Sequence, residues 1–453
     1  MISRIDAMDA VLEKRLDKCI FYNKTEYFFT SLTDRFEYAN SLWAKALQKK
    51  FGKKFEPIYI QNCKQNNYFK KKNYIIVNKA IVNLRRELGK RDLVYLEDYE
   101  DLNKEISESR IIKTLMNKLV KKQNRLFVLG FTSSFLSFSS PKIKVLGPEP
   151  KIVTKVDNKI EHIKIFRKLN LPRTDVRIYN NLKQLINNEK YPYYISAAYT
   201  SGGYESGPIK DDVDLARFEA KLRDVNRSNF FLAGNLIENI KVSPNVSAIV
   251  YGSRRTKIIC VSDQILNGNV YLGNIYPSKV SEKVKREIIK VTKEVGDYLS
   301  GLGFRGIFGL DFIVDSKNRI YTVDLNPRRQ GGYMCNLLMT QKSIVELELN
   351  VAIGAPVHIA HYDLEPYYAW AHSKIKPHTK NSEILKIFKR GSIKTPFIKP
   401  GGIFECVFYP KGHTVVAGNC GYVVVSGKNR NIVEREIEKQ AKKLGREVFG
   451  ENN

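Results

Sequence analysis

Two aspartates, Asp311 and Asp324, stand thirteen positions apart in one stretch of the chain. Each belongs to a run of apolar and β-branched residues, and a short polar segment, Ser-Lys-Asn-Arg, separates the two runs. This pattern predicts a β-hairpin. If its turn is a two-residue loop centred on Lys317 and Asn318, the two aspartates lie directly opposite each other. Side chains alternate along a strand, so Asn326 shares the face of Asp324.

The facing aspartates would repel each other, because like charges across a hairpin destabilise it. A cation between them removes this penalty. Mg²⁺ takes oxygen ligands and is commonly held by one or two carboxylates together with substrate phosphates. The three side chains therefore predict a Mg²⁺ site, although an exposed hairpin with merely polar aspartates is an alternative. Arg328 follows directly and offers a bidentate guanidinium to a phosphate or carboxylate.

A glycine-rich segment, residues 201–207, is a second candidate site. It follows residues 191–195, whose apolar composition predicts a strand. Glycine adds no side-chain bulk, so backbone N–H groups can approach phosphate oxygens there. Ser201, Gly202 and Gly203 are the candidates for this contact, and an ordinary turn is the alternative.

The elements around these residues fall into three predicted regions, residues 1–150, 151–357 and 358–453. The first alternates helical and strand patterns, which predicts an α/β domain, and a Ser-, Gly- and Pro-rich segment ends it at residues 137–150. The second contains both candidate sites, and the third is a small C-terminal domain. The main predicted helices span residues 9–18, 31–51, 159–170, 281–300 and 432–444, and the main strands span residues 74–77, 126–129, 191–195, 368–372 and 421–426.

The net charge is strongly positive, since 76 Lys and Arg residues against 47 Asp and Glu residues give +29. Such a charge attracts polyanions, so nucleic acid, an acidic partner protein and an anionic substrate all agree with it. The sequence shows no recognition helix or aromatic-bearing sheet motif that would read bases. Specific nucleic-acid binding is therefore not expected, and the charge is assigned to an anionic substrate or partner.

Several other classes of protein are excluded by composition. The six cysteines form no CxxC pair and the six histidines form no HExxH pattern, which argues against a disulfide framework and a zinc site. No apolar run reaches 18 residues, so no transmembrane helix is expected. Residues 1–18 contain acidic groups and lack the apolar core of a signal peptide, so a cytoplasmic location is predicted.

The hairpin also resembles a known family. The pattern G-x-x-G-x-D-F from residue 306, followed by D-x-N-P-R from residue 324, is similar to the metal-binding hairpin of ATP-grasp enzymes, such as D-alanine–D-alanine ligase and biotin carboxylase. Weaker similarities precede it in the family's order: Leu146-Gly147-Pro148 and Asn158-Lys159 at the domain entry, Leu236-Ile237-Glu238 at the nucleotide hinge, and residues 246–250 as the strand after it.

The resemblance implies an N-terminal α/β pre-ATP-grasp domain, a nucleotide-binding ATP-grasp domain of α+β type and a small C-terminal domain. It implies ATP and Mg²⁺ as the bound groups. The implied metal ligands are Asp311, Asp324 and Asn326; the implied ATP contacts are Lys159, Ser201, Gly202, Gly203 and Glu238; and Arg328 is the implied catalytic residue.

The resemblance implies a ligase reaction, in which a carboxylate attacks the γ-phosphate of ATP and an amine displaces phosphate from the acyl phosphate. Amide or peptide bonds between amino acids or peptides would result. Other readings remain open: loading of an amino acid onto the thiol of an acidic carrier protein, a nucleic-acid-binding protein, or a catalytically weak ATP-binding protein.

Two positions depart from the family pattern. Asp324 stands where the family usually has Glu. The aspartate side chain is shorter, but its carboxylate can still bind Mg²⁺. The family's second phosphate lysine ends the strand before the glycine loop, where this chain has Ile195-Ser196-Ala197. A substitute cation is therefore expected, with Lys210, Arg254 and Arg255 as candidates; Arg305 and Arg329 are weaker candidates for a role beside Arg328.

Overall fold

The computed structural model divides into two compact units, Ile152–Gly332 on the one hand and Met1–Lys151 with Tyr333–Asn453 on the other. The predicted boundary at residue 150 lies next to this division, whereas residues 333–357, predicted as part of the second region, group with the unit that holds both chain ends. No helix among the described residues is long and apolar enough to cross a membrane. The structure describes residues 25–32, 37–61, 73–76, 93–94, 99–199, 203, 205–223, 230–340, 343–376, 382–383, 385, 400–407, 414–415 and 420–450.

The N-terminal part of the first unit is a parallel sheet, in agreement with the predicted α/β domain. Its strands run in the order β3-β2-β1-β5-β6 and every pairing is parallel. The strands are β1 (Glu26–Thr30), β2 (Phe55–Gln61), β3 (Asn73–Ile76), β5 (Leu126–Leu129) and β6 (Ile143–Val145), and the helices are α2 (Glu37–Phe51), α4 (Tyr99–Glu108) and α5 (Arg110–Gln123). Residues 137–150, predicted as a boundary, contribute β6 to this sheet, while the helix predicted at residues 9–18 lies outside the described residues.

The C-terminal part of the same unit has an antiparallel sheet with one long helix, α13 (Arg430–Phe449), which buries Val433, Ile437 and Leu444. This matches the predicted charged terminal helix. The remaining elements of this part are β17 (Ala369–Ile375), β21 (Gly421–Gly427) and β19 (Ile403–Val407), the helices α11 (Tyr333–Met339) and α12 (Ser343–Ala352), the single turn η3 (Ile359–His361), and a small sheet of β18 (Ser382–Glu383), β20 (Thr414–Val415) and β4 (Leu93–Val94).

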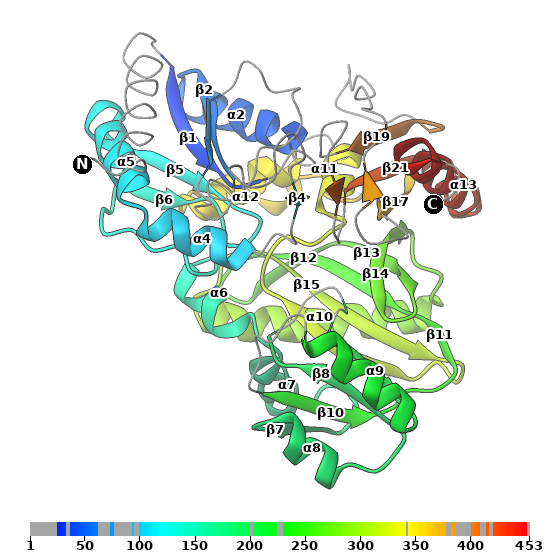
Figure 1. Cartoon of the computed structure of the whole chain (residues 1–453). Helices are drawn as coiled ribbons and strands as arrows, with labels where there is room; N and C mark the ends of the chain where they lie inside the picture. The colour runs from blue at the N-terminus through cyan, green and yellow to red at the C-terminus, as the bar shows by residue number, and fades with distance from the viewer. Residues whose placement is uncertain are drawn as a thin grey trace. The chain divides into compact units, whose positions relative to one another are not determined.

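The second unit contains two antiparallel sheets (Figure 1). The smaller sheet runs β7-β10-β8-β9, and the larger follows the order β11-β15-β12-β13-β14. Strands β11 and β12 pair with one edge of β15, and β16 pairs with its other edge. The smaller sheet is made of β7 (Val176–Tyr179), β8 (Tyr193–Ala197), β9 (Ser206–Ile209) and β10 (Phe231–Asn235), with the helices α8 (Leu182–Asn188) and α9 (Asp212–Arg223). The larger is made of β11 (Ile240–Val242), β12 (Pro244–Gly252), β13 (Arg255–Asn267), β14 (Val270–Tyr276), β15 (Gly306–Asp315) and β16 (Ile320–Asn326), with α6 (Pro150–Val156), α7 (Lys159–Lys168) and α10 (Glu282–Gly301).

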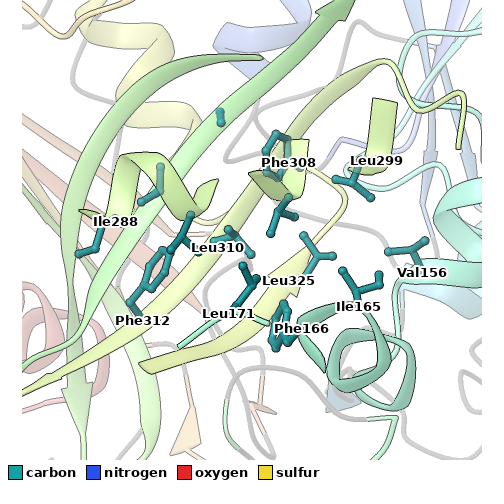
Figure 2. Close-up of a cluster of buried hydrophobic side chains, with 14 of the residues drawn as sticks. Val156, Ile165, Phe166, Leu171, Ile288, Leu299, Phe308, Leu310, Phe312 and Leu325 are labelled. Carbon is teal, nitrogen blue, oxygen red and sulfur yellow. The ribbon is translucent and has the colours of Figure 1, made fainter. Parts of the chain in front are cut away.

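One face of the larger sheet is apolar and packs against α7 and α10, which forms the main core of this unit (Figure 2). The side chains of Leu310 and Phe312 on β15 lie in this core and are fully buried. Helix α10, which matches the helix predicted at residues 281–300, contributes Ile288 and Leu299. Because side chains alternate along β15, Asp311 points to the opposite face of the sheet. The core therefore fixes the direction in which the candidate metal ligand points.

Phe312→Ala is expected to lower the free energy of unfolding by about 3–5 kcal/mol, because it leaves a cavity beneath the hairpin. Phe312 is fully buried. Val323→Ala on the facing strand is the matched control, because Val323 is 37% exposed and should change stability by no more than about 0.5 kcal/mol. Denaturant unfolding of both variants measures the difference. Equal effects of the two substitutions would contradict this description of the core.

Candidate active site

The hairpin of β15 and β16 has a three-residue turn, so the predicted two-residue turn is wrong. The N–H of Asp315 donates to the carbonyl of Arg319 at 3.1 Å, and residues 316–318 lie between them. Asn318 adopts a left-handed conformation with φ of 60°. The buried carboxylate of Asp315 holds the turn together, because it accepts hydrogen bonds from the N–H groups of Lys317 and Arg319, both at 2.9 Å.

The predicted opposition of Asp311 and Asp324 is nevertheless confirmed, because a β-bulge compensates for the longer turn. Near the turn Phe312 pairs with Thr322, but one step further Asp311 pairs with Asp324, which leaves Val323 as the extra residue. A bulge inserts one residue into one strand and thereby shifts the register by one. The longer turn alone would place Val323 opposite Asp311, and the bulge restores the aspartate.

Asp311 lies at the centre of a row of polar side chains that crosses three strands. Asn245 on β12 faces it from one side and Asp324 on β16 from the other. The amide of Asn245 donates a hydrogen bond to Oδ1 of Asp311, and the amide of Asn326 donates to Oδ2 at 3.1 Å. The structure thus brings together all three predicted metal ligands and adds Asn245, which the sequence did not single out.

Asp324 is surrounded by basic and imidazole groups. Its Oδ1 lies 2.8 Å from Nδ1 of His162, a buried residue of α7. Lys159, the first residue of the same helix, and Arg328 both act electrostatically on the Asp324 carboxylate. Arg328 is itself held by Asp157, whose Oδ2 accepts a hydrogen bond from Nε of Arg328 at 3.2 Å. The predicted residues Lys159 and Arg328 therefore lie at the aspartate pair.

The two carboxyl groups have pKa values displaced in opposite directions. Burial, and then the charge of Asp324, raise the pKa of Asp311 to about 6, against the lowering effect of the Asn245 and Asn326 amides. Burial alone would also raise the pKa of Asp324, but Lys159, His162 and Arg328 outweigh it and hold that pKa at about 2. Asp324 is therefore ionised first, and its charge opposes the ionisation of Asp311.

The raised pKa of Asp311 predicts that the metal-free protein loses stability as the pH rises from about 4 to about 6. Its ordinary pKa is 3.8, so in this window the folded state binds the proton that the unfolded state has released. The stabilisation is complete below the unfolded pKa and is lost through the folded pKa. The displacement corresponds to about 3 kcal/mol at 1.36 kcal/mol per unit. Asp324, whose pKa is lowered, contributes its own change only below this window.

Denaturant unfolding of the wild type and of Asp311→Asn across this pH range, in the presence of a chelator, measures the effect. The wild type should lose stability relative to the variant as the pH rises, and saturating Mg²⁺ should reverse the loss in the wild type alone. Parallel pH profiles of the two proteins would show that Asp311 has an ordinary carboxyl group.

The donor set fits a hard divalent cation that shares its coordination sphere with a substrate. Two carboxylates and the side-chain oxygen of Asn326 supply oxygen ligands, which Mg²⁺ prefers. Within the described part of the chain, no three or more His, Cys, Asp or Glu side chains gather into a metal site that would be complete by itself. An incomplete set of oxygen ligands, in which one carboxyl group resists ionisation, suits a metal that arrives with phosphates.

The glycine-rich segment connects β8 to β9, and the structure describes only part of it. Ser201 and Gly202 lie outside the described residues. Gly203 has φ of +80°, and a Cβ there would lie 2.0 Å from the backbone oxygen of Asn269, so only glycine fits. The amide of Asn269 donates to the carbonyl of Gly203 at 2.6 Å and also bonds Ser206. The tip of the β13–β14 hairpin thus holds one end of the segment.

The predicted hinge residue Glu238 lies in the short connection from β10 to β11, which joins the smaller sheet to the larger one. Its side chain is exposed. The neighbouring Asn239 accepts a hydrogen bond through its carbonyl from the N–H of Ser316 in the hairpin turn, at 2.9 Å. The connection is therefore tied to β15 and β16, the strands that bear the two aspartates.

Two of the suggested substitute cations, Arg254 and Arg255, are placed away from the aspartate pair, which corrects that expectation. Arg254 and Arg255 form the turn of the β12–β13 hairpin, seven or more residues along the strand from Asn245, or roughly 25 Å at the rise of a β-strand. Lys210 is exposed and follows the end of β9 that is remote from the glycine-rich segment. The sequence did not show which end of each strand carries the site.

Of the two weaker arginine candidates, Arg305 has another role. Arg305 donates to the carbonyls of Ser300 and Phe304, at 3.1 Å and 2.7 Å, and so closes the C-terminal end of α10. Arg329 is buried, and its carbonyl accepts a hydrogen bond from Arg328 at 3.5 Å.

Gln330 is a further residue that sequence reasoning missed. A Cβ on Gly309 would lie 1.9 Å from its side chain, so the Gln330 side chain packs directly against Gly309, two positions along β15 from Asp311. Ser247 donates a hydrogen bond to its Oε1 at 3.3 Å. The only signal in the sequence was the second glycine of the G-x-x-G-x-D pattern, which makes room for this side chain.

Comparisons with known proteins agree with this geometry. A model of the ATP-grasp domain matches residues 156–332. An L-propargylglycine–L-glutamate ligase of Streptantibioticus cattleyicolor is 33% identical over 129 residues, which are 28% of this chain and 26% of that protein. The C-terminal section of the carbamoyl phosphate synthase large chain of Methanopyrus kandleri is 21% identical over 249 residues, covering 51% of this chain and 44% of that protein. The chain thus spans between a quarter and a half of these relatives.

Solved structures share the fold over most of the chain. A biotin carboxylase complex from Campylobacter jejuni aligns with a TM-score of 0.65 at 14% identity, covering 92% of this chain and 91% of that one. An N5-carboxyaminoimidazole ribonucleotide synthetase from Thermotoga maritima aligns with a TM-score of 0.56 at 13% identity, covering 93% and 98%. The paired aspartates, the strand order and the family model agree, and residues 156–332 form an ATP-grasp domain.

Proposed function

We propose that this chain is an ATP-dependent ligase that joins a carboxylate to an amine. The observation that carries the proposal is the facing pair of Asp311 and Asp324 with Lys159 and Arg328 beside it, inside an ATP-grasp domain. Two acidic groups would hold the metal, and two basic groups would meet the phosphates. This combination suits the transfer of a phosphoryl group, in which positioning and charge neutralisation supply most of the catalysis.

Each residue has a physical task in this proposal. Asp311, Asp324 and Asn326 would hold Mg²⁺, which neutralises charge on the β- and γ-phosphates of ATP. The side chains of Lys159 and Arg328 would contact phosphate oxygens. Ser201, Gly202 and Gly203 would cover the phosphates through backbone N–H groups. Glu238 would meet the ribose or adenine from the connection between the two sheets, a position that is open to solvent.

The proposed reaction has two steps. An oxygen of the substrate carboxylate attacks the γ-phosphorus of ATP, which gives an acyl phosphate and ADP. An amine then attacks the acyl carbon, phosphate leaves, and the amine releases one proton to form the amide. No nucleophile from the enzyme is needed, in keeping with a site made of carboxylates, amides and cations.

Amino acids are the proposed substrates. The similarity to a ligase that joins L-propargylglycine to L-glutamate supports amino acids both as the carboxylate and as the amine. A screen for ADP release with pairs of amino acids and short peptides, including L-glutamate, tests this. ADP release that requires both a carboxylate and an amine is the expected result.

Other outcomes of the screen would select a different function. Release only with an acidic carrier protein, lost steeply as salt is added, would assign a thiol acceptor and a use for the +29 charge. ATP binding without turnover with any acceptor would indicate a non-catalytic nucleotide-binding protein. Tight, sequence-selective nucleic-acid binding at physiological salt, with no turnover, would overturn the ligase proposal.

A further inference from the structure

His162 is a buried histidine on α7 that is neither a predicted metal ligand nor an apolar residue of the core. Its side chain is only 4% exposed, and it lies on α7 one turn after Lys159. Nδ1 lies 2.8 Å from Oδ1 of Asp324, while Nε2 is buried and has no hydrogen-bond partner among the described residues. Burying an unsatisfied nitrogen costs free energy, so an apolar residue would fill this space better. The contact with Asp324 is therefore the feature that favours histidine here.

The direction of the hydrogen bond follows from the charge of its acceptor. An aspartate is ordinarily ionised near neutral pH, and an ionised carboxylate can only accept a hydrogen bond. Nδ1 of His162 must therefore carry the proton and donate a hydrogen bond to Oδ1 of Asp324. The backbone N–H of Leu325 also approaches Nδ1, but at 3.5 Å, which is the weaker contact.

The hydrogen bonds of the two carboxylates leave one oxygen without a partner among the described residues. Asn245 and Asn326 donate to the two oxygens of Asp311, and His162 donates to Oδ1 of Asp324. Oδ2 of Asp324 is the oxygen that remains. A donor fixed on Oδ1 sets the rotation of the carboxylate and therefore the direction in which Oδ2 points.

We infer that His162 is a positioning residue for the metal. By donating from Nδ1 to Oδ1 it would leave Oδ2 of Asp324 as the oxygen that faces the metal. Residues that hold metal ligands in this way change metal affinity by about 10- to 100-fold when replaced. The inference rests on the proposed Mg²⁺ site.

Helix α7 carries both His162, which contacts Asp324, and Lys159, the proposed phosphate contact. Asn158 caps the helix by accepting a hydrogen bond from the N–H of Glu161 at 3.0 Å, which fixes its first turn. Lys159 and His162 lie three residues apart, so they project from neighbouring positions of that turn. One rigid element thus places both the proposed phosphate lysine and the donor that orients Asp324.

The test compares substitutions that keep or remove a donor at the Nδ1 position. In His162→Asn the amide nitrogen stands where Nδ1 stood, but the rest of the ring is lost. His162→Phe keeps the ring and loses the donor. Mn²⁺ affinity in the presence of ADP, measured by electron paramagnetic resonance, reports the metal site without turnover. We expect near-native affinity for the Asn variant and affinity about 10-fold or more weaker for the Phe variant.

A purely structural role of His162 predicts the opposite order, because phenylalanine preserves packing and asparagine leaves a cavity. Native affinity in His162→Phe, or equal weakening in both variants, would overturn the inference. His162→Gln, whose amide cannot reach the Nδ1 position, replaces the Phe variant if that protein fails to fold. Ile288→Val, in the same core but on α10, should lower the melting temperature and leave Mn²⁺ affinity unchanged. If the wild type itself binds no Mn²⁺ with ADP, the proposed function fails instead.

Discussion

Asp324→Asn is expected to abolish Mg²⁺-dependent ATP turnover while the protein stays folded. The substitution removes the negative charge that lies opposite Asp311, and with it the carboxylate of the pair that ionises first. Loss of one preorganised electrostatic group from a phosphoryl-transfer site costs about 100- to 1,000-fold in turnover. Asp311→Asn and Asn326→Ala should have effects of the same kind, because each removes an oxygen ligand from the same set.

Asp315→Asn is the control for damage to the hairpin. Asp315 lies on the same strand as Asp311, four residues away, but its carboxylate serves the turn, where it accepts hydrogen bonds from Lys317 and Arg319. This variant should lose about 1–3 kcal/mol of stability and keep its turnover per folded molecule. Steady-state ADP release and circular dichroism on each variant separate the two effects. Near-normal turnover in Asp324→Asn would remove it from the metal site.

The pairing of the two aspartates was predictable because it depends on local sequence. Two strand-like runs joined by a short polar segment specify a hairpin, and the spacing of the acidic residues nearly fixes their register. The turn was predicted one residue too short, and the bulge at Val323 corrected the register by one residue. A bulge depends on packing across the whole sheet, and Val323 carries no local sign of it.

The residues that were missed reach the site through contacts between distant parts of the chain. His162 lies 162 positions before Asp324 and meets it only because α7 packs against β16. Asn245 faces Asp311 through the pairing of β12 with β15, 66 positions apart. Helical periodicity predicted α7 as an element, but periodicity does not state which strand a helix will cover.

Charge alone also misled the choice of substitute cations. Arg254 and Arg255 were candidates by charge, yet they lie at the β12–β13 turn, at the end of β12 remote from Asn245. Lys159 was considered because the motif resembled a domain entry, and it lies at the aspartates. Which of these cations lies near the aspartates depends on the end of the strand or helix at which each one stands. A single sequence does not reveal this.

Arg328→Met is expected to reduce turnover by about 100-fold or more, because the side chain neutralises charge at the site and no second phosphate lysine stands at the end of β8. Arg328 lowers the pKa of both Asp311 and Asp324, so its guanidinium field reaches the two proposed metal ligands. Asp157 holds the guanidinium through Nε and thereby orients the fork. Arg328→Lys keeps the charge without the fork and should recover only part of the activity.

Arg319→Gln is the matched control, since it also removes one guanidinium from the hairpin. Arg319 pairs with Asp315 at the turn, and its side chain is 64% exposed, so its contribution is screened by solvent. Turnover should stay within about twofold of the wild type. A comparable loss of turnover in both arginine variants would mean that turnover depends on the overall positive charge of the protein and not on Arg328 in particular. A loss confined to Arg328→Met, larger in kcat than in KM, would show that this guanidinium acts mainly in the transition state.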